Sequence, residues 1–293
     1  LKVFQSVAKN LSFTKASQEL FVSQPAITKH IQELEAAYQT RLFDRQGSRI
    51  SLTEAGKLLL EHCERILEDY KRLEYEMHLL HNEYTGGLKL GASTTVAQYV
   101  LPPLLASFIG KFPHVNLSLL NGNSREIEAA LQEHRIDLGF VEGVFRLPNI
   151  KYTTFLKDEL VAVVRTGSKL AIGEEITPEE LLHLPLVLRE RGSGTLDVFE
   201  RALQQHNIKL SSLQVLMYLG STESIKLFLE HTDCLGIVSI RSITRELYSG
   251  QLRVVEIKDM PMLRDFSFAQ PQGQESGLAQ VFMQFAMHYN NKL

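Results

Sequence analysis

The side chains best suited to intermolecular chemistry lie along residues 23–38, "SQPAITKHIQELEAAY". Glutamine and threonine can hydrogen-bond to base edges, and lysine can contact phosphates or guanine. At 100° per residue a helix places four residues on one face, with Gln24 at its margin: Pro25, Thr28, Lys29 and Gln32. Apolar residues spaced by four, three and four share the opposite face: Ile27, Ile31, Leu34 and Tyr38. We therefore predict one buried face and one face that contacts a partner; the alternative is an ordinary solvated surface helix.

The elements around this helix predict a winged helix-turn-helix. Two helical patterns precede it, the second beginning near Thr14, a candidate N-cap, and Ser23 is a candidate cap for the third helix. The stretch "RLFDRQGSRISLT" predicts two short strands around Gly47, with Arg45 and Arg49 beside the tip. Proteins of this class place the first residues of the second helix of the motif against base edges in the major groove.

Residues 13–56 resemble the winged helix-turn-helix of the LysR-type transcriptional regulators, and the resemblance extends along the whole chain. It implies that residues 23–38 form the recognition helix and that residues 44–50 form a wing against the DNA backbone. The DNA-contacting residues that we predict are Ser23, Gln24, Pro25, Thr28, Lys29 and Gln32 from the helix, and Arg45, Ser48 and Arg49 from the wing.

A long helix is predicted next, capped by Thr53 and running to about Tyr84. Its apolar residues alternate by four and three, which is the heptad pattern of a coiled coil. We predict that the dimerisation seam contains Leu59, Cys63, Ile66, Tyr70, Leu73, Met77 and Leu80. The alternative is a helix packed on its own domain. Paired helices imply two DNA half-sites, and the family resemblance implies a homodimer or a homotetramer built from two dimers.

The remaining residues alternate short apolar strands with helical patterns, which predicts a largely parallel sheet covered by helices. The pattern restarts after about residue 160, so we predict two α/β lobes like those of periplasmic solute-binding proteins. The predicted organisation is a DNA-binding domain (1–55), a linker helix (56–85) and an effector-binding domain (86–293). Following the resemblance, lobe one contains about 88–161 and 265–293, and lobe two contains about 162–264.

Small polar residues follow several of these strands, where open α/β sheets bind ligands beside helix N-termini. The resemblance implies that they meet in a cleft between the lobes, although each could simply cap its own helix. The candidate effector-binding residues are Ser93, Thr94, Thr95, Asn123, Ser124, Glu142, Arg191, Ser193, Gly194, Thr195, Ser221 and Thr222. Backbone N–H groups and hydroxyls favour a small anion, whereas Glu142 could repel or select a ligand. Arg189 and Arg191 could complete an anion site, or they could be surface charges. Leu196 stands where many relatives have an arginine, so the effector's identity does not carry over.

Composition and charge narrow the classes of protein to which this chain can belong. The net charge of −3 conceals eight basic and five acidic residues within positions 1–60, and a basic head suits a polyanion. Two cysteines, Cys63 and Cys234, cannot form a disulfide framework, and no apolar run reaches about 18 residues, so we expect a cytoplasmic protein without membrane contact. His78 and His81 are three apart, but the sequence offers no third metal ligand beside them, and we predict neither a metal site nor a cofactor.

The predicted function is sequence-specific binding of double-stranded promoter DNA under the control of a small, anionic effector, with RNA polymerase as a candidate partner. An enzyme is disfavoured because catalytic signatures such as G-x-S-x-G and H-E-x-x-H are absent, and "SFTK" matches S-x-x-K inside the DNA-binding motif. An architectural DNA-binding protein would not respond to metabolites. A pure solute-binding protein would have no use for the basic head.

Overall fold

The computed structural model describes residues 1–46, 49–81, 84–143, 146–170, 173, 175–272 and 277–290. The chain divides into two compact units, Leu1–Asn82 and Glu83–Leu293. Each unit has its own hydrophobic core.

The first unit contains a helix-turn-helix, a hairpin and a long helix. Its elements are α1 (Lys2–Asn10), α2 (Phe13–Glu19), α3 (Gln24–Tyr38), β1 (Phe43–Gln46), β2 (Arg49–Leu52) and α4 (Glu54–His81). The strands β1 and β2 pair antiparallel, as the predicted wing requires. Phe4 and Phe13 pack their rings against Phe43 of the hairpin, and Ile27 and Ile31 hold α3 in the same core. Tyr38, predicted to lie on the buried face, is 56% exposed because α3 extends beyond the core at its C-terminal end.

The helix caps correct two predictions and confirm one. The hydroxyl of Ser12 accepts a hydrogen bond from the Lys15 backbone N–H, so Ser12 caps α2 and the prediction of Thr14 was wrong. Ser23 precedes α3 but its side chain makes no capping hydrogen bond. Thr53 caps α4 as predicted, since its Oγ1 accepts from the Gly56 N–H at 3.0 Å.

The heptad seam of α4 has two different halves. Leu59 and Cys63 pack into the core of the helix-turn-helix, so the alternative of a helix packed on its own domain holds for these positions. Farther along, four seam residues are each about half exposed in the single chain: Ile66, Tyr70, Leu73 and Met77. The side chains of Leu80, His78 and His81 lie outside the described residues. Tyr84 lies beyond the helix, which ends at His81.

The second unit contains two groups of parallel strands with helices between them. The first group is β3 (Gly86–Ser93), α5 (Thr94–Tyr99), α6 (Leu101–Lys111), β4 (Val115–Gly122), α7 (Ser124–Gln132) and β5 (Leu138–Glu142). The second is β7 (Glu175–Ile176), η1 (Glu180–His183), β8 (Pro185–Arg189), α8 (Gly194–Gln205), η2 (Leu210–Ser212), β9 (Gln214–Leu219), α9 (Thr222–His231), β10 (Leu235–Ser239), η3 (Ile240–Ser242), α10 (Thr244–Tyr248) and β11 (Leu252–Ile257). The closing helix α11 (Leu278–Asn290) contacts α6 of the first group.

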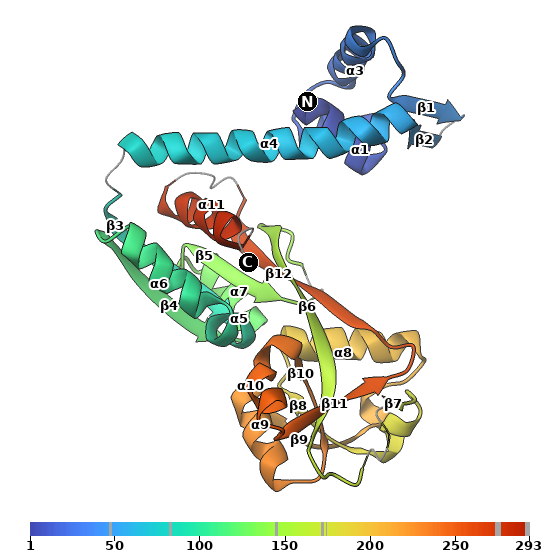
Figure 1. Ribbon diagram of the computed structural model, residues 1–293, viewed down its shortest axis with the longest axis vertical. Helices are drawn as coiled ribbons and strands as arrows, with labels where there is room; N and C mark the ends of the chain where they lie inside the picture. The colour runs from blue at the N-terminus through green and yellow to red at the C-terminus, as the bar shows by residue number, and fades with distance from the viewer. Residues whose placement is uncertain are drawn as a thin grey trace. The chain divides into compact units, whose positions relative to one another are not determined.

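Two long strands join the groups. β6 (Ile150–Arg165) and β12 (Met262–Pro271) pair antiparallel along the whole of β12 and lie side by side in Figure 1. They stand between the parallel strands of lobe one and those of lobe two, in the order β4-β3-β5-β12-β6-β10-β8-β9. The two lobes therefore share one sheet in the described part of the chain. The boundaries expected near residues 161 and 265 fall inside continuous strands.

Each lobe is held by buried apolar side chains. Lobe one packs an aromatic group around Phe108, Phe140 and Phe282, and lobe two packs helix α8 against its strands through residues such as Phe199 and Leu203. Among the described residues, no helix combines the length and the apolar character that a membrane crossing requires.

Candidate functional site

The front of α3 presents the predicted DNA-contacting face. Gln24, Pro25, Lys29 and Gln32 are exposed, and Ser23 is exposed immediately before the helix. Their polar groups are thus accessible to base edges and phosphates.

Two of these side chains already have partners on α3. The hydroxyl of Thr28, which is half-buried, donates to the Gln24 carbonyl at 3.1 Å, so its lone pairs remain to accept from a partner. The Lys29 ammonium lies 3.9 Å from a carboxylate oxygen of Glu33, and both groups are well exposed. A surface pair of this kind stabilises by at most about 1 kcal/mol, so a phosphate can replace it.

The turn before α3 contains a feature that the sequence pattern did not indicate. Phe21 has a φ of +53°, a backbone conformation uncommon for a bulky residue, and its side chain is 93% exposed. On the wing, the backbone of Arg45 pairs with Ile50. The side chains of Arg45 and Arg49, together with Ser48 as a whole, lie outside the described residues, so their contact with DNA stays a prediction.

In the second unit, several candidate effector residues cap helices, the alternative that the sequence left open. The side chains of Asn123, Ser193 and Ser221 accept hydrogen bonds from the first turns of α7, α8 and α9. Ser124 instead donates to the Glu142 carbonyl at 2.9 Å and fixes the end of β5. Ser93 is fully buried, and its hydroxyl has no hydrogen-bond partner among the described residues.

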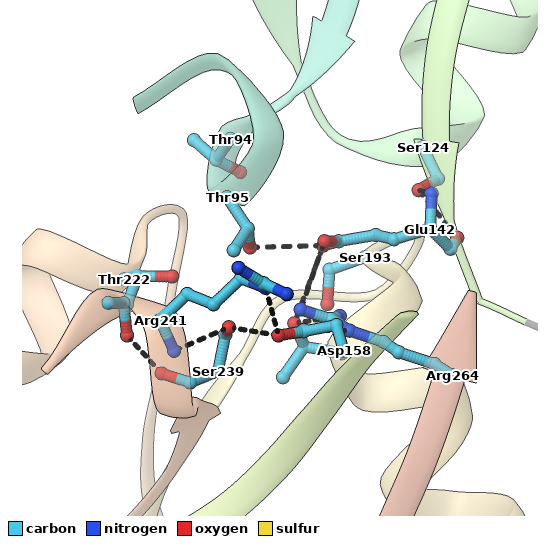
Figure 2. Close-up of polar contacts among 12 residues, drawn as sticks. Thr94, Thr95, Ser124, Glu142, Asp158, Ser193, Thr222, Ser239, Arg241 and Arg264 are labelled. Atoms are coloured by element: carbon cyan, nitrogen blue, oxygen red, sulfur yellow. Dashed lines mark hydrogen bonds and ion pairs between the residues drawn. The ribbon is translucent and has the colours of Figure 1, made fainter. Parts of the chain in front are cut away.

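The Glu142 side chain lies between the lobes (Figure 2). Its Oε1 accepts from the hydroxyl of Thr95 in lobe one at 3.3 Å and from that of Thr195 in lobe two at 3.4 Å. Its Oε2 lies 3.1 Å from Nη2 of Arg264. The orientation of these two groups does not make a hydrogen bond, so we treat this contact as an ion pair. The side chains of Glu142 and Arg264 are 1% and 0% exposed.

Arg264 also binds a second carboxylate. Its Nε donates to Asp158 at 2.7 Å, and these residues are register partners on β12 and β6. The hydroxyl of Ser239 donates to the other oxygen of Asp158 at 2.7 Å, with the partly exposed Arg241 3.7 Å away (Figure 2). Charges this deeply buried require such partners, because an unpaired buried charge is strongly destabilising.

A second arginine joins the lobes nearer to solvent. Arg189, at the end of β8, is 1% exposed, and its Nη2 donates to the hydroxyl of Thr94 in lobe one at 2.7 Å. Its Nη1 reaches Thr222 at 3.5 Å, and its Nε and Nη2 donate to the carboxylate of Glu190 at 2.9 and 3.1 Å. Only Glu190 of these groups has an appreciably exposed side chain, at 26%.

Beside this arginine a polar hollow of about 340 Å³ opens between the lobes. Its lining residues are Thr94, Gln98, Asn121, Gly122, Asn123, Glu126, Glu190, Gly220 and Ser221. Thr94, Asn123 and Ser221 were predicted from the sequence. Arg191 is not here: it is exposed and lines a different hollow, of about 310 Å³, with Lys209 and Tyr218. Arg191 therefore does not line the hollow that contains Thr94 and Ser221, whereas the buried Arg189 lies beside it.

Comparison with known proteins fits both units. Residues 1–57 match the family model described as "Bacterial regulatory helix-turn-helix protein, lysR family", and residues 81–290 match "LysR substrate binding domain". This chain belongs to the LysR family. It is a LysR-type DNA-binding transcriptional regulator with an effector-binding domain, and its homologues are transcriptional regulators rather than members of a catalytic family.

Individual relatives agree with this assignment. The chain is 35% identical over 257 residues to the "Uncharacterized HTH-type transcriptional regulator YeiE" of Escherichia coli (strain K12), covering 88% of this chain and 85% of the relative. The regulatory domain of Synechocystis PCC6803 CcmR, solved in complex with 2-PG, is 27% identical, with a TM-score of 0.65 over 71% of this chain and 99% of that one. Full-length CbnR, solved with its target DNA, shares the fold at 22% identity. Its TM-score is 0.56, and the match covers 98% of this chain and 97% of that one.

One pair of charged residues in this LysR-family chain lay outside the sequence prediction. Arg264 and Asp158 sit inside strands, where no turn or glycine marks them, so no local pattern pointed to them. Leu196, where the family resemblance led us to expect an arginine, is 3% exposed and packs in the core of lobe two. An apolar side chain there contributes no charge to the cleft.

A further contact between the lobes lies at the surface. The hydroxyl of Tyr99 in α5 donates to Glu223 in α9, whose carboxylate also pairs with Lys226 at 2.8 Å. Burial and the hydrogen bond to Glu223 raise the pKa of Tyr99. Burial alone would raise the pKa of Glu223, but hydrogen bonds from Lys226 and Tyr99 outweigh it, and the pKa of this carboxyl is lowered.

Proposed function

We propose that this regulator binds promoter DNA as a dimer or tetramer and that a small anion, bound in the hollow between the lobes, controls it. The observation that carries the proposal is Arg189, a buried cation beside the hollow whose partner Glu190 lines that hollow. The hydroxyl of Thr94 and the polar groups of Asn123 and Ser221 supply further partners. We place this activity in the cytoplasm, with RNA polymerase as a candidate partner at the promoter.

An incoming anion can replace Glu190 without leaving Arg189 unpaired. Glu190 is 26% exposed, so its carboxylate can rotate into water while a ligand oxygen takes its place on the guanidinium. Exchange of one carboxylate for another avoids the large cost of an unpaired buried arginine. The acidic residues around the hollow thus compete with an anion but do not prevent its binding.

A ligand in this hollow would couple the lobes to each other. Thr94, Gln98 and Asn121 line it from lobe one, whereas Glu190, Gly220 and Ser221 line it from lobe two. A ligand that contacts both sides stabilises one relative placement of the lobes over another. Control of transcription requires that difference in affinity, because equal binding to two states shifts neither.

The dimer would form through the exposed half of the α4 seam. Ile66, Leu73 and Met77 are each about half exposed in the single chain, at the heptad spacing that paired helices bury. Two recognition helices related by a two-fold axis then read two half-sites. CbnR, which shares this fold and was crystallised with its target DNA, supports a DNA-binding role for the fold.

The test is a thermal-shift screen of full-length protein with phosphate, sulfate and small carboxylates, with choline and polyamine salts as cationic counterparts. A bound anion should raise Tm in a concentration-dependent way, because it binds the native state. Glu190→Gln should increase the affinity for the same anion several-fold, since a neutral amide competes less well for Arg189. The same anion should change the affinity for promoter DNA in footprinting.

Two outcomes would argue against an anionic effector. One is a response to cationic metabolites but to none of the anions, and the other is an anion response that Glu190→Gln weakens. Absence of any small-molecule response would favour an architectural DNA-binding protein whose second unit only assembles the oligomer.

A further inference from the structure

The Glu142 carboxylate has the surroundings of a bound ligand. Two threonine hydroxyls, one from each lobe, donate to its Oε1 at 3.3 and 3.4 Å, and Arg264 faces its Oε2 at 3.1 Å. Hydroxyl donors with a guanidinium are the groups with which proteins hold free carboxylates. Here the carboxylate belongs to the chain itself.

Backbone packing holds this carboxylate in place. Gly194, the first residue of α8, lies so close to Glu142 that an added Cβ would approach the Glu142 carbonyl oxygen to 2.2 Å and its side-chain Cγ to 2.7 Å. A Cβ added at Gly143, whose φ is +106°, would approach the Gly194 Cα to 2.9 Å. The two lobes therefore meet directly at Glu142, and its 1% exposed side chain cannot rotate into water as that of Glu190 can.

An anion at this position balances the surrounding charges, of which Arg264, Glu142 and Asp158 are buried and Arg241 is 42% exposed. Arg264 and Arg241 provide two positive charges, and Glu142 and Asp158 provide two negative ones, all linked through contacts of 3.7 Å or less. Removing the Glu142 carboxylate leaves one net positive charge and two threonine hydroxyls without their acceptor. It also leaves a space the size of the lost side chain.

We infer that Glu142 occupies an anion-binding position between the lobes as a built-in ligand, and that it is a specificity-determining residue of the cleft. While Glu142 is present, no free anion binds between Thr95, Thr195 and Arg264, so the effector is restricted to the neighbouring hollow beside Arg189. With its side chain removed, the position binds a small free carboxylate. This inference does not depend on the effector in the hollow being an anion.

The experiment is rescue of full-length Glu142→Ala by formate. Tm is measured during a formate titration at constant ionic strength, with chloride as the replaced anion. Glu142→Ala should melt below the wild type, and formate should restore Tm saturably by at least about 3 °C, as binding to the native state predicts. Any response of the wild type reports binding in the hollow beside Arg189, and the rise in Tm of Glu142→Ala should exceed it.

A matched control is Glu223→Ala. Glu223 also joins the lobes, through Tyr99, but its side chain is 47% exposed, so water can replace its carboxylate. Formate should raise the Tm of this variant no more than it raises that of the wild type. Equal rescue of Glu223→Ala and Glu142→Ala would show a general salt effect and overturn the inference, as would a Glu142→Ala protein on which formate acts no differently from chloride.

Glu142→Gln keeps the inference testable if the alanine variant does not fold. The amide fills the same space but is neutral and directs N–H groups toward Arg264 or the threonines. We expect it to melt below the wild type and to show no formate rescue, because the position is still filled. A Glu142→Gln protein as stable as the wild type would show that the carboxylate's charge is not needed, and the inference would be wrong.

Discussion

Two arginines of the second unit are almost equally buried, yet their partners differ. Arg264 is enclosed by Glu142 and Asp158, whose side chains are 1% and 0% exposed. Arg189 is 1% exposed as well, but its carboxylate partner Glu190 is 26% exposed and lines a hollow. A buried pair is fixed because separating it leaves charges without solvation, whereas a partly hydrated partner can be exchanged. Burial of the partner, more than burial of the arginine, separates a structural ion pair from a candidate ligand site.

The largest effect should come from Arg264→Ala. This change leaves Glu142 buried without a cation and Asp158 with only the partly exposed Arg241 at 3.7 Å, which should reduce the free energy of unfolding of the second unit by about 3–5 kcal/mol. Urea denaturation followed by far-UV circular dichroism measures it. The matched control is Arg165→Ala, since Arg165 is 41% exposed and pairs with Asp233 at 3.6 Å. A loss no greater than that of Arg165→Ala would contradict the enclosed role of Arg264.

Arg189→Ala should have a smaller effect on stability and a larger effect on ligand response. Glu190 can turn to water after the change, so we expect a loss of about 1–3 kcal/mol, mainly from the unsatisfied hydroxyls of Thr94 and Thr222. The thermal shift caused by an anionic effector should disappear. If Arg189→Ala retained that shift in full while Arg264→Ala lost it, the roles of the two arginines would be reversed.

The smallest effect should come from Tyr99→Phe, at a contact that joins the lobes near solvent. The hydrogen bond to Glu223 helps keep the pKa of this carboxyl below its usual range. A carboxyl with a lowered folded-state pKa adds stability above its unfolded pKa and loses it as the pH falls through the folded value. The Tm difference between wild type and Tyr99→Phe should therefore be present at pH 7 and narrow below about pH 4. A difference that is constant across this range would indicate lost packing instead.

Local sequence patterns were sufficient to predict much of the fold. The periodicity of residues 23–38 predicted the buried Ile27 and Ile31 of α3, and Thr53 could be recognised as a cap because capping is a contact within one turn. The N-cap was predicted wrongly where two residues able to cap a helix lay close together in the sequence. Ser12 precedes α2 and Thr14 lies in its first turn, and Phe13 between them packs against the hairpin.

Some of the residues that line the hollow between the lobes were predicted from the sequence. Residues after strands, such as Thr94, Asn123 and Ser221, could be located because strand ends in an α/β sheet lie at one edge. The choice between Arg189 and Arg191 could not be made in this way. The two side chains are only two residues apart, and the chain leaves β8 between them, so one is buried beside Thr94 and the other faces a separate hollow.

By itself, the sequence determined the kinds of element, their order and the buried positions Ile27 and Ile31 of α3, because these follow from contacts within a few residues. Only the tertiary structure decided which distant charges meet. Arg264 is paired with Asp158 by the register of β12 on β6, and with Glu142 because the same strand also pairs with β5. Register depends on the packing of the whole sheet, so no local pattern reveals it. The same applies to α4, where the fold of the first unit covers Cys63 and leaves Leu73 exposed.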